Sequence, residues 1–342
     1  LLMDSFHTRD DVQAYWERQN LPPGQRPQSF LQHKFPKILE SMEPASCPQQ
    51  PELEWNPPGH GDIYAALATS GILERLVQEG KRYAFLSNSD NLGAVADPAI
   101  LGHFIRKGCF FLMEVAQRQP QDKKGGHLAR SEDGGFLLRE TAQCPESDLS
   151  SFQDIERHCF FNTNNIWIDL VRLRDFIQQQ GLPRLPLIVN PKTLDPRDES
   201  TSQVLQLETA MGAAISSFPD SCALRVARHR FMPVKKTNDL LALRSDCYVL
   251  DQGYRLLPNP QRTLPPLQIE LDPAYYKKVD DFEARFPYGP PSLLQCQSLS
   301  VSGDVCFGQK VRCKGDVEVV NNSSRQQMVS SGEALGGKVA LA

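Results

Sequence analysis

The sequence lacks long apolar runs, a basic leader and an excess of positive charge, and each absence excludes a class of protein. No apolar run approaches the ~20 residues of a membrane helix. The first residues show no basic region followed by an apolar stretch, so no signal peptide is expected. The formal net charge of −4 gives no basic footprint for nucleic acid. We therefore expect neither a membrane nor a nucleic acid as a partner.

Cysteine is present but follows no pattern. The nine cysteines are odd in number and scattered, and none forms a Cys-x-x-Cys pair. This usage favours free thiols in a reducing cytosol over a zinc site or a disulfide framework. We therefore predict a cytoplasmic protein with unpaired cysteines.

Several catalytic motifs are also absent. The chain has no G-x-x-x-x-G-K-[ST] loop, no G-x-G-x-x-G, no H-E-x-x-H and no G-x-S-x-G. These absences argue against a P-loop kinase, a dinucleotide dehydrogenase, a zinc protease and an α/β-hydrolase.

The first 251 residues alternate between short apolar runs and helical patterns. Tyr83–Leu86 and Leu187–Val189 are typical of strands. Residues 72–78 predict a helix with Ser70 as its N-cap and Gly80 as its stop, and the apolar spacing over 204–218 predicts another. Such alternation indicates a layered α/β domain with a largely parallel sheet.

In such sheets, ligands bind beyond the carboxyl ends of the strands. Asp90, Asn164 and Asn190 each follow an apolar run closely. We therefore expect these side chains at the mouth of a site.

The last part of the chain changes in character. Residues 252–291 are rich in proline and predict an extended connector with one short helix at about 274–286. Aliphatic residues then recur every six positions, which is typical of a parallel β-helix, although a β-meander with chance spacing is the alternative. The two series are Leu299, Val305, Val311, Val317 and Val301, Phe307, Cys313, Val319.

The segment 55–62, Trp-Asn-Pro-Pro-Gly-His-Gly-Asp, is the first candidate for chemistry. Its prolines fix the path of the chain and its glycines allow the backbone close to a ligand. Asp62 is placed to cap the following helix. A simple Pro/Gly turn with a surface histidine explains the segment equally well.

Four other segments carry polar groups suited to a phosphorylated sugar. Asp90 follows a strand and suits Mg²⁺, the amides of 162–165 suit sugar hydroxyls, and the lysines of 228–239 suit phosphate. Residues 123–127, Lys-Lys-Gly-Gly-His, suit a close approach to a sugar. Taken singly, each is explained by a turn or a solvated loop.

Taken in order, these segments resemble the UTP–glucose-1-phosphate uridylyltransferase (UDP-glucose pyrophosphorylase) family. The resemblance runs from residue 1 to about Val319 and rests on at least seven segments in sequence order. They are 55–62, 88–93, 124–126 with 138–143, 161–165, 188–192, 206–210, 230–235, 240–250 and 282–287.

The resemblance implies a nucleotide-sugar pyrophosphorylase α/β domain over residues 1–251, Rossmann-like with a mostly parallel mixed sheet. A connector and a short left-handed parallel β-helix follow over 252–342, and its edge offers a surface for a homo-oligomer. The implied reaction joins UTP and glucose 1-phosphate to give UDP-glucose and pyrophosphate, reversibly and with Mg²⁺.

The resemblance also implies residue roles. Lys235 is the implied catalytic residue and also contacts the nucleotide phosphates, and Asp90 ligates Mg²⁺ and contacts the nucleotide. Gln32 and Gly59 contact the uridine. The implied sugar-phosphate residues are His60, Asn88, Ser89, Glu140 and Asn164.

The chain departs from the family at its start. The family's Gly-rich triphosphate loop and a nearby Pro-Lys precede the segment that matches residues 2–6, and neither is present. We therefore expect an N-terminally truncated sequence. Two other readings stay open: a non-catalytic nucleotide-sugar-binding protein without the loop, and a related N-acetylhexosamine-1-phosphate pyrophosphorylase.

Overall fold

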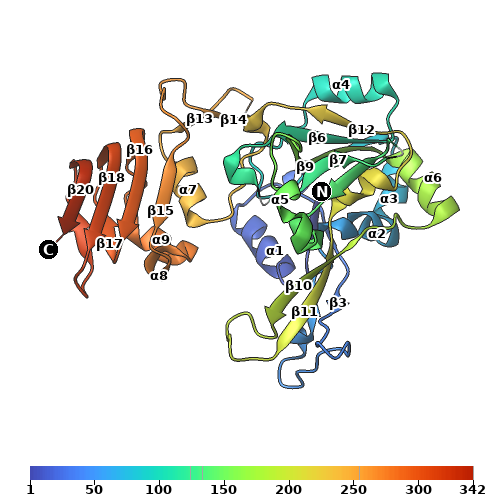
Figure 1. Ribbon diagram of the computed structural model, residues 1–342, viewed down its shortest axis with the longest axis horizontal. Coiled ribbons are helices and arrows are strands. Elements are labelled where there is room, and N and C mark those ends of the chain that lie inside the picture. Colours follow the sequence, from blue (N-terminus) through green and yellow to red (C-terminus); the bar gives the residue numbers. More distant parts are fainter. Residues whose placement is uncertain (124, 133, 254, 342) are drawn as a thin grey trace. The chain divides into compact units, whose positions relative to one another are not determined.

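A computed structural model describes residues 1–123, 125–132, 134–253 and 255–341 (Figure 1). The chain forms two compact units. The first comprises residues 1–87 and 96–227, and the second comprises residues 88–95 and 228–342. No helix in the described ranges is long and apolar enough to cross a membrane.

The first unit is built around a six-stranded sheet in the order β12-β6-β9-β7-β8, with β5 also paired to β9. Its strands are β5 (Tyr83–Leu86), β6 (Phe111–Gln117), β7 (His127–Arg130), β8 (Phe136–Arg139), β9 (Phe160–Asp169) and β12 (Ser221–Arg225). Among the described strands of this sheet, only the β12–β6 pair is parallel, whereas β9 runs antiparallel to β5, β6 and β7. The prediction of a mostly parallel sheet is therefore wrong, because β9 is inserted against the direction of its neighbours.

Successive residues of β6 face opposite sides of this sheet, so each side has its own core. Phe111 and Met113 belong to the larger core, which also contains residues of α2, α3 and α6. Leu112 packs with Phe104 of α4 and Trp167 of β9. The helices are α2 (Ile63–Thr69), α3 (Ile72–Gln78), α4 (Pro98–Lys107), α5 (Leu149–Phe152) and α6 (Leu170–Gln180).

Helix α3 has the predicted bounds. Gly71 is its N-cap residue, and the Ser70 hydroxyl accepts a hydrogen bond from the Ile72 N–H at 3.4 Å. At the other end, the Gly80 N–H donates to the Val77 carbonyl, so Gly80 follows the last turn as expected.

The other predicted helix, over 204–218, is wrong. Strand β11 (Gln203–Thr209) pairs antiparallel with β10 (Leu187–Thr193), and a 3₁₀ helix follows over Met211–Ser216. Within that 3₁₀ helix, Met211, Ala214 and Ile215 pack in the core. The apolar residues that suggested one helix therefore belong to two different elements. Pairing with β10 makes residues 203–209 a strand.

The first unit also contains shorter pairs of strands. β1 is parallel to β2, and β3 is antiparallel to β4. These elements and the first helix are β1 (Leu2–Asp4), α1 (Arg9–Arg18), β2 (Ser29–Leu31), β3 (Phe35–Pro36) and β4 (Trp55–Asn56).

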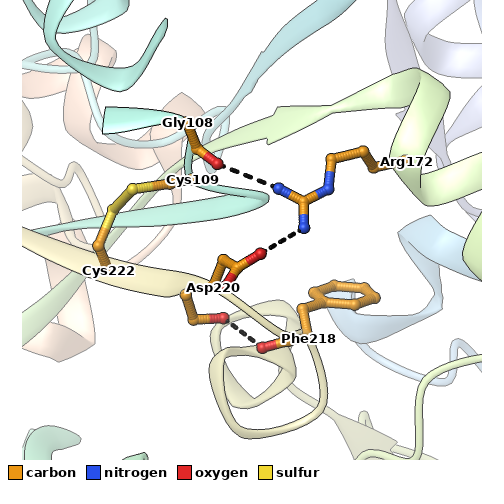
Figure 2. Close-up of a disulfide and its surroundings, with 7 residues drawn as sticks. Gly108, Cys109, Arg172, Phe218, Asp220 and Cys222 are labelled. Carbon is orange, nitrogen blue, oxygen red and sulfur yellow. Dashed lines mark hydrogen bonds and ion pairs between the residues drawn. A yellow bond between two sulfur atoms is a disulfide. The ribbon is translucent and has the colours of Figure 1, made fainter. Parts of the chain in front are cut away.

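Two of the nine cysteines are paired, against the prediction that all are free. Cys109, before β6, forms a disulfide with Cys222 of β12 (Figure 2). The two lie 113 residues apart in sequence, and the parallel pairing of β12 with β6 brings them together. Arg172 of α6 donates to the Gly108 carbonyl at 3.1 Å and to the Asp220 carboxylate at 2.7 Å, so it ties the same two segments (Figure 2).

The second unit contains a parallel sheet in the order β15-β16-β18-β20 (Figure 1). It also contains a parallel β17–β19 pair. Its strands are β13 (Tyr248–Leu250), β14 (Leu256–Pro258), β15 (Gln268–Leu271), β16 (Ser292–Ser302), β17 (Val305–Phe307), β18 (Arg312–Asn321), β19 (Gln327–Val329) and β20 (Ala334–Leu341). Its helices are α7 (Thr237–Arg244), α8 (Pro273–Tyr276) and α9 (Val279–Arg285). The single helix predicted in the connector is thus two short helices.

All residues of the six-residue repeat are at most 2% exposed and lie in one apolar core. Neighbouring strands align the repeats, since Val301 pairs with Val319, and Val319 pairs with Val339. The parallel pairing argues against the β-meander, while a left-handed β-helix stays a prediction.

The units divide at Ala227 and Arg228, and not at the predicted boundary between residues 251 and 252. Leu241 of α7 is fully buried in the core of the second unit. Residues 228–251 therefore belong with the C-terminal strands, because Leu241 and Cys247 are buried in that core.

Candidate nucleotide-sugar site

The loop at Gly59 and His60 is packed directly against β11. Gly59 has φ +78°, and a Cβ there would lie 2.6 Å from the Thr209 carbonyl oxygen. The Thr209 N–H donates to the Pro58 carbonyl at 2.8 Å. Glycine is therefore required here by both backbone conformation and space.

His60 is oriented by the 3₁₀ helix that follows β11. Its Nδ1 accepts a hydrogen bond from the Met211 N–H at 3.0 Å, so the ring proton of neutral His60 lies on Nε2. The Met211 carbonyl accepts from the Tyr64 hydroxyl at 2.7 Å. Burial raises the pKa of Tyr64, so this hydroxyl remains a donor and holds Met211 in place.

Asp62 is the N-cap residue of α2, as predicted, but its carboxylate binds His33 and makes no capping hydrogen bond to the helix. Its Oδ2 accepts from the His33 N–H at 2.7 Å, and the His33 Nδ1 lies 3.0 Å from Oδ1. Asp62 is buried, whereas the side chain of His33 is 41% exposed. This contact ties Gln32, the neighbour of His33, to the loop that carries His60.

Gln32 presents a buried polar atom. Its N–H donates to the Asp4 carbonyl at 2.9 Å, but its side-chain Oε1 is buried and has no hydrogen-bond partner among the described residues. A buried acceptor without a hydrogen-bond partner has lost its hydrogen bonds to water, which costs free energy. A donor on a ligand would restore a hydrogen bond and remove that cost.

Asn164 lies within β9, and not beyond a strand end as predicted. Its backbone has φ +58°, and the pairing of β9 with β6 is interrupted between Asn162 and Ile166. The Asn164 Oδ1 accepts from the Asn162 Nδ2 at 2.6 Å, and its N–H donates to the Asn162 Oδ1 at 2.8 Å. A left-handed residue inside a strand is strained and points to a functional position. Asn190 likewise lies inside a strand, β10.

Glu114 supports this irregular strand, and the sequence reasoning missed it. Its carboxylate is fully buried and accepts from the Asn165 Nδ2 at 3.1 Å and the Trp167 Nε1 at 2.9 Å. Its carbonyl accepts from the Thr163 hydroxyl at 2.8 Å. One acidic residue in the otherwise apolar run of β6 was the available signal.

Glu140 lies beside the same strand. A Cβ on Gly126 would lie 2.5 Å from either oxygen of Glu140, and the Gly126 carbonyl accepts from the Asn162 N–H at 3.3 Å. A Cβ on Gly212 would lie 2.5 Å from the Asn162 Nδ2, and Gly212 follows Met211. These shared neighbours bring Glu140, Asn164 and His60 into one region. Lys124 lies outside the described residues.

The remaining predicted residues belong to the second unit. Residues 88–95 run beside residues 230–234: the Val234 N–H donates to the Asp90 carbonyl at 2.9 Å, and the Leu92 N–H donates to the Met232 carbonyl at 3.1 Å. The Asn91 side chain secures the contact, since its Oδ1 accepts from the Met232 N–H at 2.8 Å.

This pairing places Asp90 beside Val234, the residue before Lys235. Lys235 is exposed, and its N–H donates to the Asp239 carboxylate at 2.9 Å. Among the described residues, neither the Lys235 ammonium nor the half-buried Asp90 carboxylate has a hydrogen-bond or ion-pair partner. The second unit thus presents a cation and a carboxylate from adjacent segments, with Asn88 half-buried and Ser89 exposed in the same loop.

The comparisons with known proteins agree over most of the chain. The family model described as UTP–glucose-1-phosphate uridylyltransferase matches residues 1–314. The uridylyltransferases of Musa acuminata and Hordeum vulgare are each 40% identical over 99% of this chain, which spans 71% and 70% of their lengths.

Solved structures give the same result. A mutant of UDP-glucose pyrophosphorylase from Leishmania major matches with a TM-score of 0.88 and 42% identity, over 100% of this chain and 74% of that one. UDP-glucose phosphorylase from Trypanosoma brucei matches with a TM-score of 0.84 and 44% identity, over 100% and 75%. The α/β fold with mixed sheets is that of these pyrophosphorylases, and the chain belongs to the UTP–glucose-1-phosphate uridylyltransferase family.

Proposed function

We propose that the protein is a nucleotidyltransferase that converts UTP and glucose 1-phosphate to UDP-glucose and pyrophosphate, reversibly. Membership of the family supports this reaction. The observation that carries it is the backbone pairing of residues 88–95 with 230–234, which sets Asp90 beside the segment of Lys235. The two substrates are polyanions that repel each other, and a cation such as the Lys235 ammonium offsets this repulsion when both are bound.

Gln32 and Gly59 are assigned to the uridine, and His60, Glu140 and Asn164 to the sugar phosphate. The unpartnered Oε1 of Gln32 suits a donor on the base. The Glu140 carboxylate suits sugar hydroxyls, which donate to it. Asn88 and Ser89 are also assigned to the sugar phosphate.

Mg²⁺ is the proposed cofactor, with Asp90 as its protein ligand. No group of three acidic, histidine or cysteine side chains suited to a metal occurs in the described part of the chain. Mg²⁺ does not require one, since it is commonly held by one or two carboxylates, waters and substrate phosphates. The unpartnered carboxylate of Asp90 fits that role. When bound, Mg²⁺ neutralises phosphate charge.

The chemistry needs little from a base, because the attacking phosphate oxygen of glucose 1-phosphate is already an anion. That oxygen forms a bond to the α-phosphorus of UTP while the bond to the pyrophosphate oxygen breaks, and pyrophosphate leaves with that electron pair. Lys235 stabilises the negative charge that gathers on the phosphates. Positioning and charge therefore account for the catalysis.

We also propose that the C-terminal strands form a left-handed parallel β-helix whose last strand, β20, offers an edge for a homo-oligomer. The all-parallel pairing of β15, β16, β18 and β20 supports the first part. An edge strand presents backbone groups that a second copy can pair with. A cytoplasmic location is proposed with the function.

The test measures pyrophosphate release by the full chain from UTP with glucose 1-phosphate, and separately with N-acetylglucosamine 1-phosphate. We expect release with glucose 1-phosphate at a kcat/KM at least tenfold higher. Faster release with the N-acetyl sugar favours the related pyrophosphorylase. Binding of UDP-glucose without pyrophosphate release from either sugar 1-phosphate favours a non-catalytic binding protein. It overturns the proposed enzymatic activity.

A further inference from the structure

A cavity of about 560 Å³ lies in the first unit, lined by residues that none of the proposed roles uses. Its volume lies within the range of small-molecule sites. The elements around it are β6, β7, β8, β9, β12 and the segment before β9.

The cavity is lined by three arginines. Arg130 of β7 and Arg225 of β12 form no ion pair with a carboxylate among the described residues. Arg157 is closer to neutralised, because Asp154 lies near it: hydrogen bonds from the backbone N–H groups of Arg157 and Glu156 lower the pKa of the Asp154 carboxyl most, and the Arg157 guanidinium lowers it further. The cavity therefore carries an uncompensated positive charge, which favours an anionic ligand.

The rest of the lining is apolar. Val115, Leu128, Phe136 and Phe160 line the cavity, and the guanidinium of Arg130 lies 4.8 Å from the centre of the Phe136 ring. Guanidinium groups bind phosphate oxygens in a fixed planar geometry, while aromatic side chains offer a surface for an apolar group. The lining thus suits a ligand with an anionic end and an apolar end.

One wall of the cavity is fixed from behind by a buried arginine. Arg118 is 4% exposed and donates to the Phe152 carbonyl at 3.0 Å and the His158 carbonyl at 3.2 Å. The ring of His158, which lines the cavity, is stacked on His127 at 4.1 Å. The wall that carries Arg157 and His158 is therefore held in shape before a ligand arrives, which lowers the cost of binding.

We propose that this cavity binds a small organic phosphate with an aromatic or apolar group, its phosphate held by Arg130 and Arg225 and its apolar group against Phe136 and Phe160. This ligand site goes beyond the proposed function and does not depend on it. Since no cavity residue is assigned to UTP or the sugar phosphate, binding is separable from turnover.

The test uses phenyl phosphate as the probe and isothermal titration calorimetry of the full chain. We expect phenyl phosphate to bind at least tenfold more tightly than either inorganic phosphate or benzoate, because only the first has both a phosphate and a ring. Arg225→Gln should weaken binding about tenfold and the pair Arg130→Gln with Arg225→Gln further, because each loses a charge-assisted hydrogen bond.

Arg325→Gln is the matched control, since Arg325 is exposed in the second unit and outside the cavity. It should leave the affinity unchanged. Arg130 and Arg225 are exposed as well, and thermal unfolding should confirm that their variants fold. The proposal is overturned by equal affinity for benzoate, by unchanged binding in the double variant, or by displacement of phenyl phosphate by UDP-glucose.

Discussion

The six-stranded sheet of the first unit and the parallel sheet of the second differ in the regularity of their strand pairing and in the polarity of their buried side chains. In the first, β9 breaks its register at Asn164, and a carboxylate, Glu114, is buried to support the break. In the second, every residue of the six-residue repeat is apolar and buried. Regularity gives the second sheet a continuous apolar core, whereas the irregularity in the first sheet holds polar side chains of the candidate site in a strained segment.

This difference has a physical basis. A backbone in a regular ladder satisfies its own hydrogen bonds and leaves the side chains to pack. A residue in a left-handed conformation costs free energy and persists only when its surroundings hold it. The hydrogen bonds between Asn162 and Asn164 do so here. The candidate site residues should therefore affect activity more than stability, and the repeat residues the reverse.

The largest expected effect falls on activity. Lys235→Ala should lower kcat on the order of hundreds-fold, because a preorganised positive charge on the phosphates is lost. The unfolding temperature should not change, since the side chain is exposed. Steady-state assays and thermal unfolding check this, with Lys236→Ala, its exposed neighbour, as control. Near-normal turnover by the Lys235 variant would remove Lys235 from the catalytic role.

The converse variant is Phe307→Ala in the second unit. Phe307 is fully buried and stacks on Phe286 at 4.9 Å. Its truncation should lower the free energy of unfolding by about 3–5 kcal/mol, because a cavity is left behind. Urea unfolding measures this. Met328→Ala, on the paired strand but 57% exposed, should change stability by less than about 0.5 kcal/mol; equal losses in the two variants would contradict the comparison.

The disulfide distinguishes the first unit, because the described cysteines of the second unit are free. Cys222→Ser should lower the free energy of unfolding by about 3 kcal/mol, since Cys109–Cys222 closes a loop of more than a hundred residues. Denaturant unfolding with and without reductant checks this. Cys47→Ser, a free half-buried cysteine, is the control. A full count of nine reactive thiols in unfolded protein kept from reductant would show that the bond is absent.

The last prediction concerns the pH dependence of stability, with the smallest effect per pH unit. Burial, with His158 and nearby arginines, lowers the pKa of His127 from 6.5 to about 3. As pH falls below 6.5, the His127 ring binds a proton in the unfolded chain but stays neutral in the folded chain until the pH is near 3. The free energy of unfolding should therefore fall on the order of 1 kcal/mol per pH unit between pH 6.5 and 3.

His127→Phe should flatten that slope, because Phe has no group to titrate and keeps a ring against Phe152 and His158. Urea unfolding from pH 7 to 4 measures it. His7→Gln, at an exposed position, is the control. An unchanged slope in the His127 variant would assign the acid sensitivity to other groups.

The position of part of the candidate site could be predicted from neighbouring residues in the sequence. Asp90 follows strand β5 as predicted, because an apolar run that ends in polar residues is a local signal. The order of the segments also predicted the family, which the comparisons confirm. The roles of the site residues stay predictions. Glu114 was missed because a single charge in an apolar run has no meaning until its partners, Asn165 and Trp167, are known.

The sequence by itself determined the features that rest on near neighbours. The six-residue spacing set which side chains form the second core, and Gly80 ended α3. The tertiary structure decided the rest: the antiparallel direction of β9, the strand at 203–209, the Cys109–Cys222 pair and the conformation of Asn164. Each of these depends on contacts between segments far apart in the chain, and local propensity carries no information about such contacts.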